Sequence, residues 1–180
     1  KKLLDEYLVF YRPKDVVSGD FYFIEGTHVT NDEQTPVVLF AAVDCTGHGV
    51  PGAFMSIVGN NYLSQTLTAP NVNSPAEALD FLNVGVCKAL RQDKANQGTT
   101  TVRDGMDIAL CALDKATNTL YFAGAKNPVY IVRKARGENQ DVFGLGASEK
   151  NPMKWDEGDI YLYEIKGDKQ PIGAYMDEEL

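Results

Sequence analysis

Residues 37–56 constrain the fold of this chain more than any other segment; they read V-V-L-F-A-A-V-D-C-T-G-H-G-V-P-G-A-F-M-S. The apolar run at residues 37–43 has the length and the β-branched and aromatic content of a strand buried on both faces. Asp44 follows it directly, and a glycine-rich stretch with Pro51 leads into a second apolar segment. Glycine allows close backbone approach to a ligand, and proline suits the first turn of a helix. The segment therefore predicts a buried strand, a carboxylate at its end, a glycine loop and a helix.

The predicted position of Asp44 indicates a metal site. A carboxylate at the edge of a core is costly unless a cation meets it. Asp20 has a similar setting, because it follows Ser18-Gly19 within the strand pattern of residues 16–24, where glycine suggests a bulge or close approach of a ligand. A hairpin would place the two strands side by side, although the register that decides whether the carboxylates converge is not fixed by sequence.

Two further aspartates, Asp104 and Asp107, flank Gly105 at the start of another predicted strand. Hard oxygen ligands of this kind suit magnesium or manganese rather than zinc. The alternative is that aspartates at strand ends only cap turns, which is ordinary turn chemistry. Asp107 lies in an apolar strand, so it must be paired or ligated if it is buried.

The composition is that of a single globular domain over residues 1–180, with 44% hydrophobic and 23% charged residues. A net charge of −8 argues against nucleic acid as a partner, since phosphate backbones need clustered Lys and Arg. The three cysteines have no C-x-x-C spacing, which argues against a disulfide framework or a thiolate zinc site. Because neither a signal peptide nor an apolar run long enough for a membrane span is visible, a cytoplasmic location is expected.

The predicted elements favour an α+β fold, a layered sandwich of antiparallel β-sheets flanked by two long helices. The first helix should bury a stripe of Met55, Val58, Tyr62 and Thr66, broadened by Phe54 and Ile57. The segments from residue 106 to residue 133 are expected to form one antiparallel meander, and residues 134–158 an exposed excursion. The predicted strands are 16–24, 37–43, 106–113, 119–125, 129–133 and 159–165, and the predicted helices are 51–69 and one that begins at Pro75, after the capping box at 74–77, and extends to about residue 90.

The sequences of four motifs resemble those of one protein family. V-S-G-D-F-Y at 17–22, D-C-T-G-H-G-V-P-G-A-F-M-S at 44–56, D-G-M-D at 104–107 and G-A-K-N-P-V-Y at 124–130 occur in the order found in SpoIIE/RsbU-type phosphatases. These are metal-dependent protein serine/threonine phosphatases of the PPM family, relatives of protein phosphatase 2C. The resemblance implies a protein phosphatase 2C-like fold and a centre of two Mn²⁺ or Mg²⁺ ions, at which an activated water attacks phosphorus without a phosphoenzyme.

The resemblance also implies roles for individual residues. Asp20 and Asp44 match the metal-binding aspartates of the first two motifs, and Cys45 would donate its backbone carbonyl. Asp104 could hold a third, weaker metal. His48 could protonate the leaving oxygen, although its spacing from Asp44 differs from that in protein phosphatase 2C, so a role in structuring the loop is the alternative.

The later motifs of the family, which supply further metal ligands, have no match in residues 134–180, so the chain is expected to lack the C-terminal part of the domain and to have little activity alone. An incomplete sheet would leave an edge open to a second copy, which suggests a homodimer. The implied partners are a phosphorylated protein of the anti-anti-sigma type in bacterial signalling, and an upstream sensor or linker that could tether the full-length protein to a membrane. The alternative function is a non-catalytic regulatory or interaction fragment. A nucleotide-binding function is disfavoured, because G-x-x-x-x-G-K-[ST] is absent.

Overall fold

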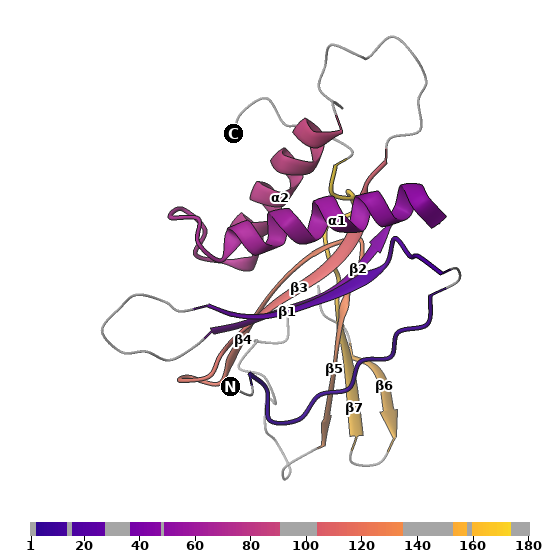
Figure 1. Cartoon of the computed structure of the whole chain (residues 1–180). Helices are drawn as coiled ribbons and strands as arrows, with labels where there is room; N and C mark the ends of the chain where they lie inside the picture. Colours follow the sequence, from indigo (N-terminus) through magenta and orange to yellow (C-terminus); the bar gives the residue numbers. More distant parts are fainter. Residues whose placement is uncertain are drawn as a thin grey trace.

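The computed structural model describes residues 3–13, 16–27, 37–47, 49–90, 104–134, 153–157 and 160–173. Antiparallel strands form two sheets, of order β1-β2-β3-β4 and β5-β7-β6. Figure 1 shows α1 and α2 above the four-stranded sheet and the strands of the second sheet below it. The elements are β1 (Phe21–Thr27), β2 (Val37–Cys45), α1 (Gly49–Thr66), α2 (Pro75–Ala89), β3 (Met106–Asp114), β4 (Thr119–Ala125), β5 (Val129–Lys134), β6 (Met153–Glu157) and β7 (Ile160–Ile165).

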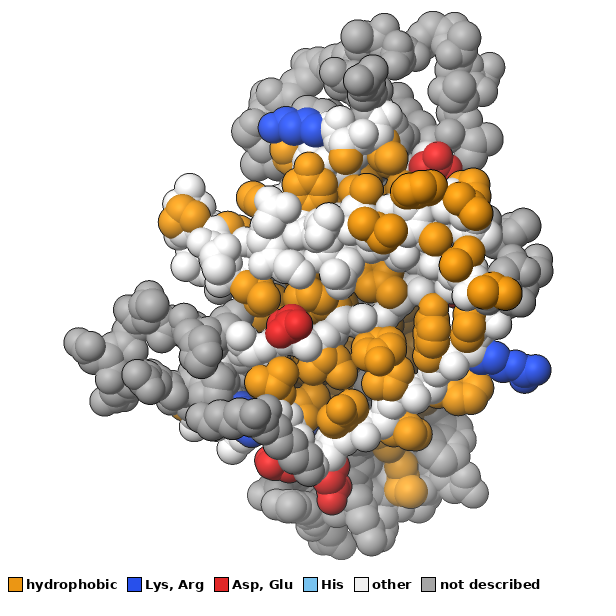
Figure 2. Space-filling view, in the orientation of Figure 1, with side chains coloured by type: hydrophobic (Ala, Val, Ile, Leu, Met, Phe, Trp, Pro, Cys, Tyr) orange, Lys and Arg blue, Asp and Glu red, His pale blue; other side chains and the backbone are white. Residues whose placement is uncertain are grey.

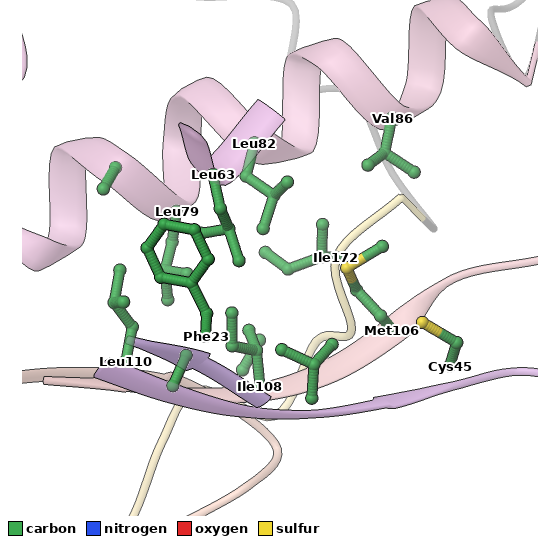
Figure 3. Close-up of a cluster of buried hydrophobic side chains, with 14 of the residues drawn as sticks. Phe23, Cys45, Leu63, Leu79, Leu82, Val86, Met106, Ile108, Leu110 and Ile172 are labelled. Atoms are coloured by element: carbon green, nitrogen blue, oxygen red, sulfur yellow. The ribbon is translucent and has the colours of Figure 1, made fainter. Parts of the chain in front are cut away.

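The core lies between the two helices and the four-stranded sheet (Figure 3). Leu63 of α1 and Leu82 of α2 are fully buried, and they face Phe23, Ile108 and Leu110 of the sheet. Burial of each such side chain stabilises the fold by about 1.5–3 kcal/mol. This packing fixes which face of the sheet is covered by helices and which face is left for other groups.

The second helix begins as its sequence predicts. Ser74 has an extended backbone, and its side chain accepts the N–H of Glu77, while Pro75 occupies the first helical turn. The Glu77 carboxylate in turn accepts the N–H of Asn73. These bonds satisfy N–H groups that a helix start leaves without partners.

The first helix buries the predicted stripe in part: Met55 and Thr66 are buried, and Val58 and Tyr62 are partly buried against the core. Its buried positions are Gly52, Met55, Gly59, Leu63 and Thr66. Phe54 and Ile57, which the sequence assigned to the stripe, are 65% and 57% exposed. A prediction from apolar residues does not count glycine as a buried position. Glycine is nevertheless favoured where the helix meets the sheet, because a position without a side chain allows close approach. Figure 2 shows hydrophobic side chains gathered over the first half of α1.

Three strand predictions were wrong in part. Residues 16–20 are not a strand, because the N–H of Asp20 is donated to the side chain of Ser18 in a local turn. β5 does not extend the β3–β4 hairpin into a meander, since Lys126 adopts φ 60° and the chain leaves the sheet to pair with β7. Within residues 134–158, expected to be an excursion, β6 pairs with β7.

The segment that follows β7 returns to the four-stranded sheet. Ile172 pairs with Met106 through two backbone hydrogen bonds of 2.9 and 3.0 Å. Gly105 makes this approach possible, because a Cβ there would lie 2.5 Å from the carbonyl oxygen of Ile172. Gly173 adopts φ 88° and donates its N–H to Asn83 of α2. The start of β3 is thus held between β2 and this returning segment.

Neither of the helices in the described ranges is long and apolar enough to cross a membrane.

The exposure of Phe54 next to the buried Met55 can be tested with two adjacent substitutions. Met55→Ala should lower the free energy of unfolding by about 2–5 kcal/mol, because Met55 is almost fully buried. Phe54→Ala should change it by no more than about 0.5 kcal/mol, because that side chain faces water. Urea unfolding of both variants measures the difference. Equal losses would show that Phe54 is part of the buried stripe, as the sequence predicted.

Candidate metal centre

The register of the four-stranded sheet places three aspartates in one row across its edge. Asp44 of β2 lies directly opposite Asp107 of β3. Extending the neighbouring pairs by one residue places Asp20, just before β1, beside Asp44, and Lys126, just after β4, beside Asp107. We call Asp20, Asp44 and Asp107 the acidic row. The pairs that fix its position are Phe21–Val43, Asp44–Asp107 and Ile108–Ala125.

The acidic row lies on the face of the sheet away from the helices. Val43 and Ile108, the next residues along the strands, are buried in the core beneath the helices. Because successive side chains in a strand point to opposite faces, Asp44 and Asp107 point to the other face. In Figure 1 this is the side on which the second sheet lies.

Asp20 and Asp44 repel each other across the end of the hairpin. The pKa of the Asp20 carboxyl is raised, first by partial removal from water, then by the negative charge of Asp44 and by a hydrogen bond between the two side chains. The N–H of Cys45 donates to Asp20 and acts in the opposite direction. A pair of carboxyls in this state would be stabilised by a cation placed between them.

Asp107 extends this negative region to β3. Partial burial raises the pKa of its carboxyl and the charge of Asp44 adds to the rise, while the ammonium of Lys126 lowers it. The Lys126 Nζ lies 4.0 Å from Asp107 Oδ1. Asp44 is therefore the shared neighbour of the other two carboxylates.

Close backbone packing sets the position of Asp20. A Cβ on Gly52, in the first turn of α1, would lie 2.7 Å from the carbonyl oxygen of Gly47 and 3.1 Å from the Cα of Gly19. Gly47 itself has φ 87°, a conformation that favours glycine. The glycines at these three positions let the turn before β1, the loop after β2 and the helix meet at one point.

Thr46 joins the loop after β2 to the start of β3. Its N–H and its hydroxyl both lie 2.9 Å from the carbonyl oxygen of Gly105, and its hydroxyl oxygen accepts the N–H of Gly105 at 2.6 Å. These contacts span the two strands just beyond Asp44 and Asp107, so they hold the two aspartates in register.

The side chain of Cys45 lies on the helix side, in the core, and only 3% of the residue is exposed. Burial, followed by the charges of Asp20 and Asp44, raises the pKa of its thiol to about 12. The thiol is therefore protonated at neutral pH and is not a nucleophile. That the Cys45 carbonyl binds metal stays a prediction.

The other predicted site residues have different outcomes. Asp104 is exposed, and strand pairing places Asp107, not Asp104, opposite Asp44. His48 lies outside the described residues. The sequence marked Asp107 as an oxygen donor that must be paired or ligated if buried, without giving it a place in the ligand set, and its position one residue before the buried Ile108 puts its side chain on the face of β3 away from the helices.

The donors fit a hard divalent cation, but only as part of a site. Within the ranges that the structure describes, no three carboxylate, imidazole or thiol groups converge closely enough to hold a metal ion. The carboxylates instead interact in pairs through Asp44. Oxygen donors of this type match Mg²⁺ and Mn²⁺.

Comparisons with known proteins agree with the motifs and the fold. The family model of stage II sporulation protein E (SpoIIE) matches residues 35–148, which include Asp44, Asp107 and Lys126. Among solved structures, the SiaA-PP2C domain of Pseudomonas aeruginosa superposes with a TM-score of 0.57 and 27% identity, over 91% of this chain and 50% of that chain. The chain thus spans half the length of that structure. No match was found among curated proteins.

Repulsion within the acidic row predicts an effect on stability. For metal-free protein in EDTA, Asp44→Asn should raise the unfolding temperature at pH 7, because Asp20 and Asp107 each lose a neighbouring negative charge. Both carboxyls have raised pKa values, so they bind protons in the unaltered chain as the pH falls toward 3.8, and the gain should shrink over that range. Thermal unfolding followed by circular dichroism measures it.

Asp114→Asn, at the other end of β3, is the matched control with the opposite sign. The N–H of Ala116, and then a side-chain hydrogen bond with Thr117, lower the pKa of Asp114. The Asp114 carboxylate contributes to the free energy of unfolding above pH 3.8, and this contribution is lost as the pH falls through the lowered pKa. At pH 7, Asp114→Asn should therefore be less stable than the unaltered chain. If Asp44→Asn destabilises the protein in the same way, the proposed repulsion is absent.

Proposed function

The chain belongs to the SpoIIE family, and from this premise we propose that it is the metal-dependent part of a phosphatase that hydrolyses phosphoserine or phosphothreonine on a protein. The observation that carries the proposal is the acidic row, in which Asp44 lies between Asp20 and Asp107. Like charges directly opposite each other destabilise an antiparallel pair, and a cation bound there would offset this repulsion on the face away from the helices, where Asp44 is exposed to a substrate.

Bound Mn²⁺ or Mg²⁺ would activate the attacking water and neutralise charge on the phosphoryl oxygens. Asp20, in the turn just before β1, and Asp44, in β2, would hold the metal, with the carbonyl of Cys45 beside them. Asp107 would contribute from β3, either as a direct ligand or through a bound water. Thr46 and the glycine contacts at Gly52 keep these groups in place while the substrate binds.

The nucleophile in this proposal is water, because the described cysteines are unsuited to the role. Cys45, Cys87 and Cys111 are all buried, and none of them forms a disulfide. The pKa values of the Cys45 and Cys111 thiols are raised, to about 12 and about 11, so a thiolate is scarce at neutral pH. A covalent phosphocysteine is thus disfavoured, in agreement with a direct in-line displacement.

The proposed substrate is a phosphorylated regulatory protein, by resemblance one of the anti-anti-sigma type in bacterial signalling. A second candidate function, a regulatory or interaction module without catalysis, is favoured by one observation: in the described part of the chain no three ligand groups converge on a metal position. The two candidates differ in whether the chain binds metal at the acidic row and turns over phosphate esters.

Titration calorimetry with Mn²⁺ separates them. The unaltered chain should bind Mn²⁺, and Asp44→Asn should weaken binding by more than tenfold, since loss of groups that only support a metal ligand already costs about 10–100-fold. Asp114→Asn, remote from the row, should leave the affinity unchanged. Turnover of p-nitrophenyl phosphate and of a phosphoserine protein is measured at saturating Mn²⁺.

Metal binding with slow, Asp44-dependent turnover is the expected result. Metal binding without any turnover favours the regulatory module, and turnover that survives Asp44→Asn contradicts the assignment of the row.

A further inference from the structure

Lys126 is the only cation at this edge of the four-stranded sheet among the residues that the structure describes in β1 to β4 and their ends. The register continues the acidic row to Lys126, one residue beyond the Ile108–Ala125 pair, and its ammonium lies on the same side as Asp107. Four neighbouring positions therefore carry three negative groups and one positive group.

The backbone of Lys126 is held in an unusual conformation. Its φ is 60°, in the left-handed region, and the other non-glycine residue with positive φ in the described part is Asn118, a type that tolerates it. The Lys126 N–H donates to the carbonyl oxygen of Asp168 at 2.6 Å, and the N–H of Asp168 donates to Gly124 at 2.7 Å. Gly124 and Gly167 permit this crossing, because a Cβ on Gly167 would lie 2.6 Å from the Gly124 backbone.

The ion pair with Asp107 does not account for this arrangement. A separation of 4.0 Å is too long for a hydrogen bond, and the Lys126 side chain is 48% exposed. An exposed pair of this kind contributes about 0–1 kcal/mol, which is less than the roughly 1–2 kcal/mol that the left-handed conformation costs a lysine. Strain that local contacts do not offset is more often found at functional sites.

The charged groups that face Lys126 are carboxylates, so an anionic ligand would need a cation bound at the acidic row beside it. Asp107 and, beyond it, Asp44 lie on its sheet side. Asp168 lies on the returning segment, where its carboxylate accepts the N–H of Lys169. If Asp44 and Asp107 bound a divalent cation, Asp107 would no longer pair with the Lys126 ammonium, which would then be available to an anionic group.

We propose that Lys126 binds the phosphoryl group of the substrate, donating N–H to a phosphoryl oxygen while the acidic row holds the metal. The inference rests on the proposed function and adds a substrate-binding residue to it. No bond to Lys126 forms or breaks; its role is to orient the phosphoryl group and to offset its charge, as expected for a flexible ammonium beside a phosphate.

The test measures binding of inorganic phosphate by calorimetry at saturating Mg²⁺, so it does not depend on turnover. Lys126→Met should raise the dissociation constant for phosphate at least about tenfold. A tenfold change corresponds to about 1.4 kcal/mol of binding free energy. Lys126→Arg, which keeps the charge, should retain most of the affinity. Lys126→Gly, which relieves the left-handed strain and removes the ammonium, should weaken phosphate binding as Lys126→Met does while raising the unfolding temperature.

Lys115→Met is the matched control, because Lys115 pairs with Asp5 beyond the opposite end of β3. It should leave phosphate affinity unchanged. Mg²⁺ affinity, measured for every variant, should be unchanged or higher after Lys126→Met, since a cation has left the acidic row. A loss of Mg²⁺ affinity that accounts for the phosphate effect would overturn the inference in favour of a structural role.

The two proposals fail in different ways. If the unaltered chain binds no Mg²⁺ or Mn²⁺, the proposed function fails and this inference fails with it. If metal and phosphate bind and Lys126→Met has the same phosphate affinity as the unaltered chain, only the inference is wrong.

Discussion

Asp44 and Asp107 lie opposite each other on β2 and β3, and this pair of like charges makes the end of the four-stranded sheet acidic. Like charges directly opposite each other destabilise an antiparallel pair. The next pair along, Val43 with Ile108, is buried beneath the helices, and burial of each such side chain is worth about 1.5–3 kcal/mol. The burial of Val43 and Ile108 therefore stabilises this register more than the repulsion between Asp44 and Asp107 destabilises it. Core packing forces two carboxylates together at a place where they would not associate on their own.

The surroundings of the row keep it from relaxing. Thr46 binds Gly105 beyond the charge pair, so the strands cannot fray to separate Asp44 from Asp107. At Asp20, the glycine contacts around Gly52 leave no room for the turn to move toward α1. Carboxylates that are prevented from separating lower the stability of the metal-free protein, and a cation bound there, as proposed, would raise it.

The sequence carried part of this arrangement. Asp44 at a strand end, Asp20 beside a glycine, and the hairpin between them could be predicted, because apolar runs and glycines report local structure. The register that brings Asp107 opposite Asp44 could not, since it is set by packing between strands distant in sequence. The same limit explains α1, where Gly52 and Gly59 face the sheet although a count of apolar residues selects Phe54. The fold prediction of antiparallel sheets flanked by helices is confirmed, whereas the metal ligands stay predictions.

The segment after β7 connects the cationic end of the row to the second helix. The carbonyl of Asp168 holds the N–H of Lys126, and Ile172 pairs with Met106, the residue before Asp107. Gly173, next in the chain, bonds to Asn83 of α2 and accepts the thiol of Cys87 at 3.4 Å. The two groups expected to meet metal and phosphate, Asp107 and Lys126, are thus positioned by the same short segment. Because that segment is anchored on α2, the geometry of the site depends on how α2 packs against the sheet, and a group bound at the row would in turn stabilise that packing.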